Sequence, residues 1–255
     1  MRRREKFVIL SVLLGVLLWV VQLVPPDLRY YAIGVFGILT YFGSALVLRE
    51  DLQGFEWVTI LPFPTMYSLI VSAFYFLLPD NFWSMIGILG FFSLGMYAIL
   101  LSSNIFSVAK GRTIALLNAA QSISLFFAML ISLLSINTIF SSHFPYYING
   151  LLIFLTHLPL TLTIAWSVNL ESKISREIVG LSLGVTILMV QFGVILSFLP
   201  LNVWNIALLL MSLYYLLLGV MQNFLREKLF KHTVGEYALL AGFICLMLII
   251  LFPGK

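Results

Sequence analysis

The stretch FWSMIGILGFFSLGMYAILLS, residues 82–102, contains no charged side chain in 21 consecutive residues. A helix needs about 20 apolar residues to cross the hydrocarbon core of a bilayer, and a backbone in lipid must satisfy its own hydrogen bonds. This stretch therefore predicts a transmembrane helix. The composition of the whole chain agrees, because 62% of its 255 residues are hydrophobic and only 9% are charged. Soluble domains have about 25% charged residues.

The same criterion, applied outward from residues 82–102, predicts about nine spans. The windows are 7–24, 30–48, 58–78, 82–102, 114–136, 146–168, 178–199, 203–224 and 238–252. The last window is short, so an eight-span body with a surface segment is the alternative. The first window is long for a signal peptide and no small-residue cleavage site follows it, which favours an uncleaved first span. We therefore predict an all-α, polytopic helical bundle forming one membrane-embedded domain, 1–255.

The basic residues predict the orientation of these spans. With the amino terminus in the cytoplasm, twelve of the fourteen Lys and Arg residues fall on the inner side, and only Arg29 and Lys255 fall outside. Inner loops of membrane proteins carry such an excess of cations. We expect a multi-pass protein of the cell membrane with its amino terminus inside and its carboxyl terminus outside. The net charge of +4 is then explained by the basic residues that orient the spans in the membrane. No nucleic-acid partner is therefore expected.

A short motif occurs twice on the predicted outer side, as LPDNFW at 78–83 and LPLNVW at 199–204. The alignment of the two copies extends toward the amino terminus, where Glu50 aligns with Glu171 and Glu56 aligns with Glu177. With an offset of 116, RYYAIG at 29–34 also resembles PYYING at 145–150. These matches predict two parallel four-helix repeats, 1–104 and 105–237, followed by an extra span, 238–255. Trp83 should then superpose on Trp204. The alternative is convergence, since any outer turn favours proline to end a helix, asparagine to cap the next and tryptophan at the interface.

The charged residues argue against several kinds of membrane protein. All ten acidic and all fourteen basic residues lie in predicted loops or at span ends. Proton relays, voltage sensors and ion pathways usually place ionisable groups within the spans. The sequence therefore disfavours a proton-driven pump, a voltage sensor and a retinal protein. The lone Cys245 allows no disulfide framework or thiolate metal cluster, and no cofactor is expected.

The polar residues within the spans suggest one intramembrane site. In the fifth span, Asn118, Gln121 and Ser122 share a helix face, beside a row of small residues at Ser124, Ala128 and Ser132. Of the Asp, Glu, Lys, Arg and His side chains, His157 is the only one deep in a span. A polar site formed by Asn118, Gln121, Ser122 and His157 is one interpretation. Helix packing through interhelical hydrogen bonds is the other, and it is the one that we favour. The sequence offers His157 no evident Ser, Cys or Asp partner for catalysis.

Two further features admit a functional interpretation. Pro62 and Pro64 could mark a broken transporter helix, although proline is ordinary in the first turn of a helix. The predicted inner side also carries an acidic group that could serve a membrane enzyme acting on lipid-linked substrates. This acidic group consists of Glu50, Asp51, Glu56, Glu171 and Glu177.

The stretch NIFSVAKGRTIALLNAAQSISLFFAMLIS, residues 104–132, resembles a group of uncharacterised multi-span proteins of candidate-phylum bacteria with reduced genomes. The resemblance involves Asn104 at the start of the loop, Arg112 to Ile114 at the entry to the span, and Ala119 to Gln121. The resemblance implies a location in a bacterial cell membrane. It assigns no function to any residue of this chain, because these proteins have no assigned activity.

Taken together, these features favour a non-catalytic membrane subunit or scaffold whose partners are membrane lipids and other membrane subunits. A facilitator for a neutral or lipid-like solute is the main alternative.

Overall fold

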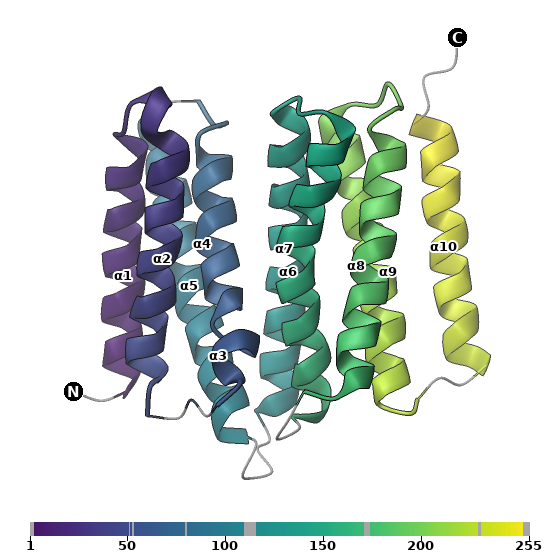
Figure 1. Cartoon of the computed structure of the whole chain (residues 1–255), viewed down its shortest axis with the longest axis horizontal. Coiled ribbons are helices and arrows are strands. Elements are labelled where there is room, and N and C mark those ends of the chain that lie inside the picture. Colours follow the sequence, from purple (N-terminus) through teal and green to yellow (C-terminus); the bar gives the residue numbers. More distant parts are fainter. Residues whose placement is uncertain are drawn as a thin grey trace. The chain divides into compact units, whose positions relative to one another are not determined.

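The first half of the computed structural model consists of long helices that run side by side (Figure 1). The structure describes residues 3–50, 52, 54–79, 81–109, 116–170, 174–228 and 231–251, without the side chains of residues 3, 231–234 and 251. The elements of this half are α1 (Arg3–Gln22), the 3-10 turn η1 (Pro26–Leu28), α2 (Arg29–Leu48), α3 (Glu56–Thr59), α4 (Pro62–Tyr75) and α5 (Phe82–Ala109).

The second half is also helical, and the chain divides into two compact units. Its helices are α6 (Leu117–Ser141), α7 (Tyr146–Asn169), α8 (Arg176–Leu196), α9 (Val203–Leu225) and α10 (Lys231–Leu251). The first unit is Met1–Phe127 and the second is Ala128–Lys255, so α6 contributes residues to both. The predicted repeat units, 1–104 and 105–237, have a different boundary, and duplication of a four-helix unit stays a prediction.

Eight helical segments in the described part of the chain are long and apolar enough to cross a membrane. They correspond in order to the first eight predicted windows, with α3 and α4 together forming the third. The ninth window forms α10, whose described apolar stretch, Gly235–Ile250, is shorter than the others. The all-α membrane bundle predicted from the sequence is therefore confirmed, and the chain is an integral membrane protein.

The third predicted span is divided at its start. Helix α3 has only four residues, and α4 begins at Pro62 after a turn in which the Ile60 N–H donates to the Glu56 carbonyl at 2.8 Å. Pro62 lacks an N–H and its fixed φ suits the first turn of a helix. Pro62 and Pro64 therefore occupy the ordinary position for proline at a helix start.

Helix α5 continues beyond the predicted end of its span. It has 28 residues and reaches Ala109, so its length of about 42 Å exceeds the bilayer core. Ser107, in the added part, is buried and donates from Oγ to Oε2 of Glu56 at 3.0 Å. The Glu56 carboxylate thus forms a hydrogen bond with the end of α5 that lies beyond the apolar stretch. The apolar pattern of the sequence does not reveal this hydrogen bond, because it joins polar residues on two different helices.

An aromatic cluster forms the core of the first unit. The ring of Tyr67 on α4 stacks on Phe92 of α5 with centroids 5.3 Å apart, and meets the edge of Phe127 on α6 at 5.5 Å. The Tyr67 hydroxyl also donates to the carbonyl of Phe91 at 3.2 Å. Gly95, one turn beyond Phe92, has no side chain and lets α5 lie directly against the Tyr67 ring. The position of the Tyr67 ring in this core therefore requires a glycine at residue 95.

The two copies of the Leu-Pro-x-Asn-x-Trp motif form the same turn. The preceding helices end at Tyr75 and Leu196, and the following helices begin at Phe82 and Val203, so both boundaries are offset by the same 121 residues. Three backbone hydrogen bonds recur at this offset. At the first turn the acceptors are the carbonyls of Phe74, Tyr75 and Asn81, and at the second they are those of Ile195, Leu196 and Asn202.

The asparagines of both motifs cap the helices that follow. Oδ1 of Asn81 accepts from the Ser84 N–H at 2.7 Å, and Oδ1 of Asn202 accepts from the Trp204 N–H at 3.0 Å. The tryptophan rings face outward, with exposed fractions of 80% for Trp83 and 50% for Trp204. The capping role predicted for asparagine is therefore confirmed. This matching local geometry fits both duplication and convergence, because each contact is made within its own turn.

We expect the two caps to contribute equally to stability. Asn81→Ala and Asn202→Ala should each lower the free energy of unfolding by about 1 kcal/mol, since each leaves a first-turn N–H without its side-chain acceptor. Asn→Asp at the same positions keeps the acceptor and serves as the control. Unfolding of the purified variants in mixed micelles measures the difference. An unchanged stability in both alanine variants would contradict the capping role.

Candidate functional site

The residue that the sequence singled out, His157, lies in a polar cluster inside the second unit. His157 is on α7 and is fully buried. Its Nε2 is 2.9 Å from Oγ of Ser132 on α6, and its Nδ1 is 3.0 Å from the Ile153 carbonyl and 3.0 Å from Oγ1 of Thr156. Both ring nitrogens therefore have polar neighbours. We refer to Ser132, Thr156, His157, Thr161 and Tyr214 as the His157 cluster.

The hydrogen-bond directions in the cluster follow from the chemistry of the partners. A backbone carbonyl can only accept, so Nδ1 of His157 carries a hydrogen and donates to Ile153. In the neutral imidazole Nε2 is then the acceptor, and the Ser132 hydroxyl donates to it. This arrangement joins α6 to α7 by a hydrogen bond between side chains.

A second pair of hydroxyl groups extends the cluster to α9. Oγ1 of Thr161 donates to the His157 carbonyl at 2.7 Å, which uses its only hydrogen. The Tyr214 hydroxyl, 3.0 Å from the same oxygen, therefore donates to Thr161. The ring of Tyr214 also meets the His157 ring edge to face, with centroids 4.9 Å apart. Three helices of the second unit are thus connected through one group of buried polar side chains.

The geometry corrects one expectation from the sequence. A serine partner for His157 does exist, because the hydroxyl of Ser132 lies within hydrogen-bond distance of the ring. A catalytic serine must also be reachable by its substrate. Ser132, His157 and Tyr214 are all fully buried. The hydrogen bond of this buried pair connects α6 to α7. Helix packing as the role of the polar residues in the spans stays a prediction.

The other three residues of the predicted polar site lie on the part of α6 that belongs to the first unit. Gln121 is buried, whereas Asn118 and Ser122 are exposed. Ser122 donates from Oγ to the Asn118 carbonyl at 3.0 Å, a bond within one helix. In the described structure the hydrogen-bond partners of the His157 ring are Ser132, Thr156 and Ile153, and none of these is Asn118, Gln121 or Ser122. A shared site of Asn118, Gln121, Ser122 and His157 stays a prediction.

The acidic side chains predicted on the inner side have different environments. Oε1 of Glu50 forms an ion pair with Nζ of Lys6 at 2.9 Å, while Glu56 is fully buried beside Ser107. Glu177 is exposed in the first turn of α8, in the second unit, so it does not share the environment of its predicted counterpart Glu56. Asp51 and Glu171 lie outside the described residues. Among the residues that the structure describes, no group of three His, Cys, Asp or Glu side chains could hold a metal ion.

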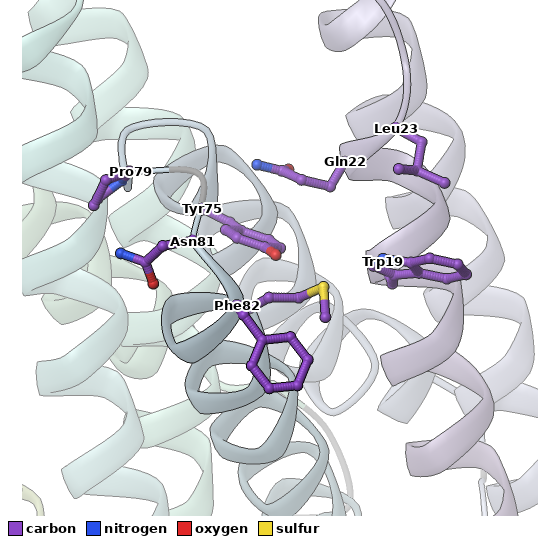
Figure 2. Close-up of a pocket in the computed structure, with 8 residues that line it drawn as sticks. Trp19, Gln22, Leu23, Tyr75, Pro79, Asn81 and Phe82 are labelled. Atoms are coloured by element: carbon purple, nitrogen blue, oxygen red, sulfur yellow. The ribbon is translucent and has the colours of Figure 1, made fainter.

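The first unit contains a cavity that the sequence did not indicate. It has a volume of about 320 Å³ and lies where α1 ends and α5 begins. Figure 2 shows Gln22 reaching from α1 toward the segment that carries Tyr75 and Pro79. The lining residues are Trp19, Gln22, Leu23, Tyr75, Pro79, Asn81, Phe82 and Met85. Three of them belong to the LPDNFW motif, and Asp80 of this motif lies outside the described residues.

The cavity lining combines aromatic surface with uncharged polar groups. Its polar side chains include the carboxamides of Gln22 and Asn81 and the phenol of Tyr75. Oε1 of Gln22 is buried and accepts no hydrogen bond within the described structure. Ligand sites are typically apolar cavities of about 300 to 1,000 Å³ with a few placed polar groups. The volume and lining of this cavity fall in that class.

No protein-family model, no curated protein sequence and no solved structure matches the chain.

Proposed function

We propose that this protein is a non-catalytic subunit or scaffold of the cell membrane, with its amino terminus in the cytoplasm and its carboxyl terminus outside. The partners that we propose are membrane lipids and other membrane protein subunits. The distribution of basic residues, twelve inside and two outside, supports the orientation. The resemblance of residues 104–132 to bacterial multi-span proteins supports the choice of membrane.

The observation that carries the proposal is the His157 cluster. A solute path through a membrane protein needs polar groups that face the path. In the second unit, the side chains of Ser132, His157, Thr161 and Tyr214 are buried and bonded to one another or to backbone carbonyls. Small and polar residues used in this way hold transmembrane helices together. The cluster supports a fixed helical framework on which other subunits assemble.

The proposal is tested by purifying the chain from its native membrane with a tag on its carboxyl terminus. We expect a stable protein partner to co-purify at constant stoichiometry, and an impermeant antibody to label the tag on intact cells. Labelling only after permeabilisation would reverse the proposed orientation. Purification of the chain alone from gently solubilised membranes would contradict the subunit role.

A facilitator for a neutral or lipid-like solute is the second candidate. The cavity lined by Gln22 and Asn81 favours it, as does the burial of Gln121 from the predicted polar site. Reconstituted liposomes separate the two functions. A subunit should leave the flux of a neutral solute such as glycerol at the level of empty liposomes. A flux that Gln121→Leu abolishes and Ser122→Ala preserves would replace the subunit proposal with transport, since only Gln121 of this pair is buried.

A further inference from the structure

An apolar groove lies beside the cavity in the first unit. The groove has a volume of about 290 Å³ and lies between α1 and α5. Trp19 lines both the cavity and the groove, so the two are adjacent. The remaining residues of the groove are Val12, Gly15, Val16, Leu89, Gly90 and Ser93.

The dimensions of this combined site match one leaflet of a bilayer. Val12 in the groove and Gln22 in the cavity are separated along α1 by about 15 Å, at 1.5 Å per residue. The hydrocarbon core is about 30 Å thick, so each leaflet contributes about 15 Å. The polar groups lie at the end of the span and the apolar side chains extend toward its middle. An amphiphile in that leaflet has the same distribution of polar and apolar atoms.

The hydrogen-bonding groups at the cavity indicate the chemistry of the head group. Oε1 of Gln22 is a buried acceptor that lacks a donor among the described residues, which makes a hydroxyl donor favourable there. Asn81 already uses its Oδ1 to cap α5, so its Nδ2 hydrogens are the part of the amide that could donate to a ligand. A group offering both a hydroxyl and an acceptor oxygen suits this pair. Among the described residues that line the cavity, none carries a charge that could act as a counter-ion, and an uncharged head group therefore suits them better.

We propose that the first unit binds a single-chain bilayer lipid with an uncharged, hydroxyl-bearing head group, such as a monoacylglycerol. Its head group lies against Gln22 and Asn81, and its acyl chain lies in the groove between α1 and α5. The leaflet is the one on the side where α1 ends, which the basic residues predict to be the outer leaflet. This site is independent of the proposed subunit role, because co-purification of a protein partner does not require it.

Two glycines on α5 provide a matched test of the acyl-chain position. A Cβ at Gly90 or at Gly87 meets no atom within 4 Å, so a leucine can be introduced at either position without a clash at its Cβ. Only Gly90 lines the groove. Gly90→Leu therefore fills the groove, while Gly87→Leu adds the same side chain to the same helix outside it.

The experiment uses the full chain in nanodiscs and a monoacylglycerol that carries a photoreactive diazirine in its acyl chain. We expect crosslinks to map by mass spectrometry to peptides containing Val16 or Leu89, and Gly90→Leu to reduce them about tenfold, with Gly87→Leu unchanged. Gln22→Leu should weaken competition by unlabelled monoacylglycerol about threefold to tenfold, since one hydrogen bond to the head group is lost.

Three results would overturn the inference. The first is equal labelling of the unmodified chain, Gly90→Leu and Gly87→Leu. The second is labelling confined to peptides outside α1 and α5. The third is stronger competition by a lipid of charged head group, such as phosphatidylglycerol, than by monoacylglycerol. If Gly90→Leu loses the crosslinks but still co-purifies with a protein partner, the lipid site and the subunit role are separate properties, and either can be wrong without the other.

Discussion

Replacement of Gly95 by leucine is expected to lower the free energy of unfolding by about 3 kcal/mol, the upper part of the usual range for overpacking a core. A Cβ at this position would lie against the hydroxyl and ring of Tyr67 and against the ring of Phe127. The Tyr67 ring cannot turn away without loss, because it stacks on Phe92 and its hydroxyl donates to the Phe91 carbonyl. The added side chain must therefore separate α4 from α5.

The effect is measured by denaturant or heat unfolding of the purified protein in micelles. Gly87→Leu is the control, since it adds the same side chain to the same helix where space is open. In the background of Gly95→Ala, Tyr67→Phe removes the nearest clashing atom and should restore part of the lost stability. Equal stability of Gly95→Leu and Gly87→Leu would mean that α4 and α5 do not approach each other at this point.

His157→Leu should lower the free energy of unfolding by about 2 kcal/mol. Hydrogen bonds between transmembrane helices contribute about 0.6 to 2 kcal/mol, and a buried polar group left without its partner costs about 1 to 3 kcal/mol. The leucine cannot accept from Ser132 or donate to the Ile153 carbonyl, so both of these bonds are lost. The apolar contact with the Tyr214 ring is largely retained.

A double-mutant cycle isolates the bond between the two helices. Ser132→Ala alone should cost about 1 kcal/mol, and much less in the background of His157→Leu, because its partner is already gone. Ser122→Ala is the control, since Ser122 is exposed and its hydroxyl donates to a carbonyl of the same helix. Additive effects of Ser132→Ala and His157→Leu would show that the two side chains do not interact in the folded protein.

The fold class could be predicted because each span is decided locally. A run such as residues 82–102 is transferred into lipid on its own hydrophobicity, and its backbone bonds are satisfied within the helix. The caps at Asn81 and Asn202 were predictable for the same reason, since each bonds to a helix that starts beside it. The buried hydrogen bond that Glu56 accepts was not predictable, because its donor Ser107 is far away in the sequence.

The candidate sites were predicted less completely. The sequence identified His157 and the small-residue row that contains Ser132, but it did not pair them, and it gave no reason to select Thr161 or Tyr214. Tyr214 comes from α9, and its approach to Thr161 depends on how α7 and α9 pack. The cavity was missed because Gln22 and Asn81 each have a local explanation as a polar residue at a span end.

By itself, the sequence determined that this chain lies in a membrane, where its spans fall along the chain, and that the two motif turns are capped, because these properties depend on the hydrophobicity of continuous segments and on contacts between near neighbours. Only the tertiary structure decided which polar groups pair inside the second unit and where α1 and α5 leave a groove in the first. Those features arise from side chains on different helices, and their distances are set by close packing at positions such as Gly95.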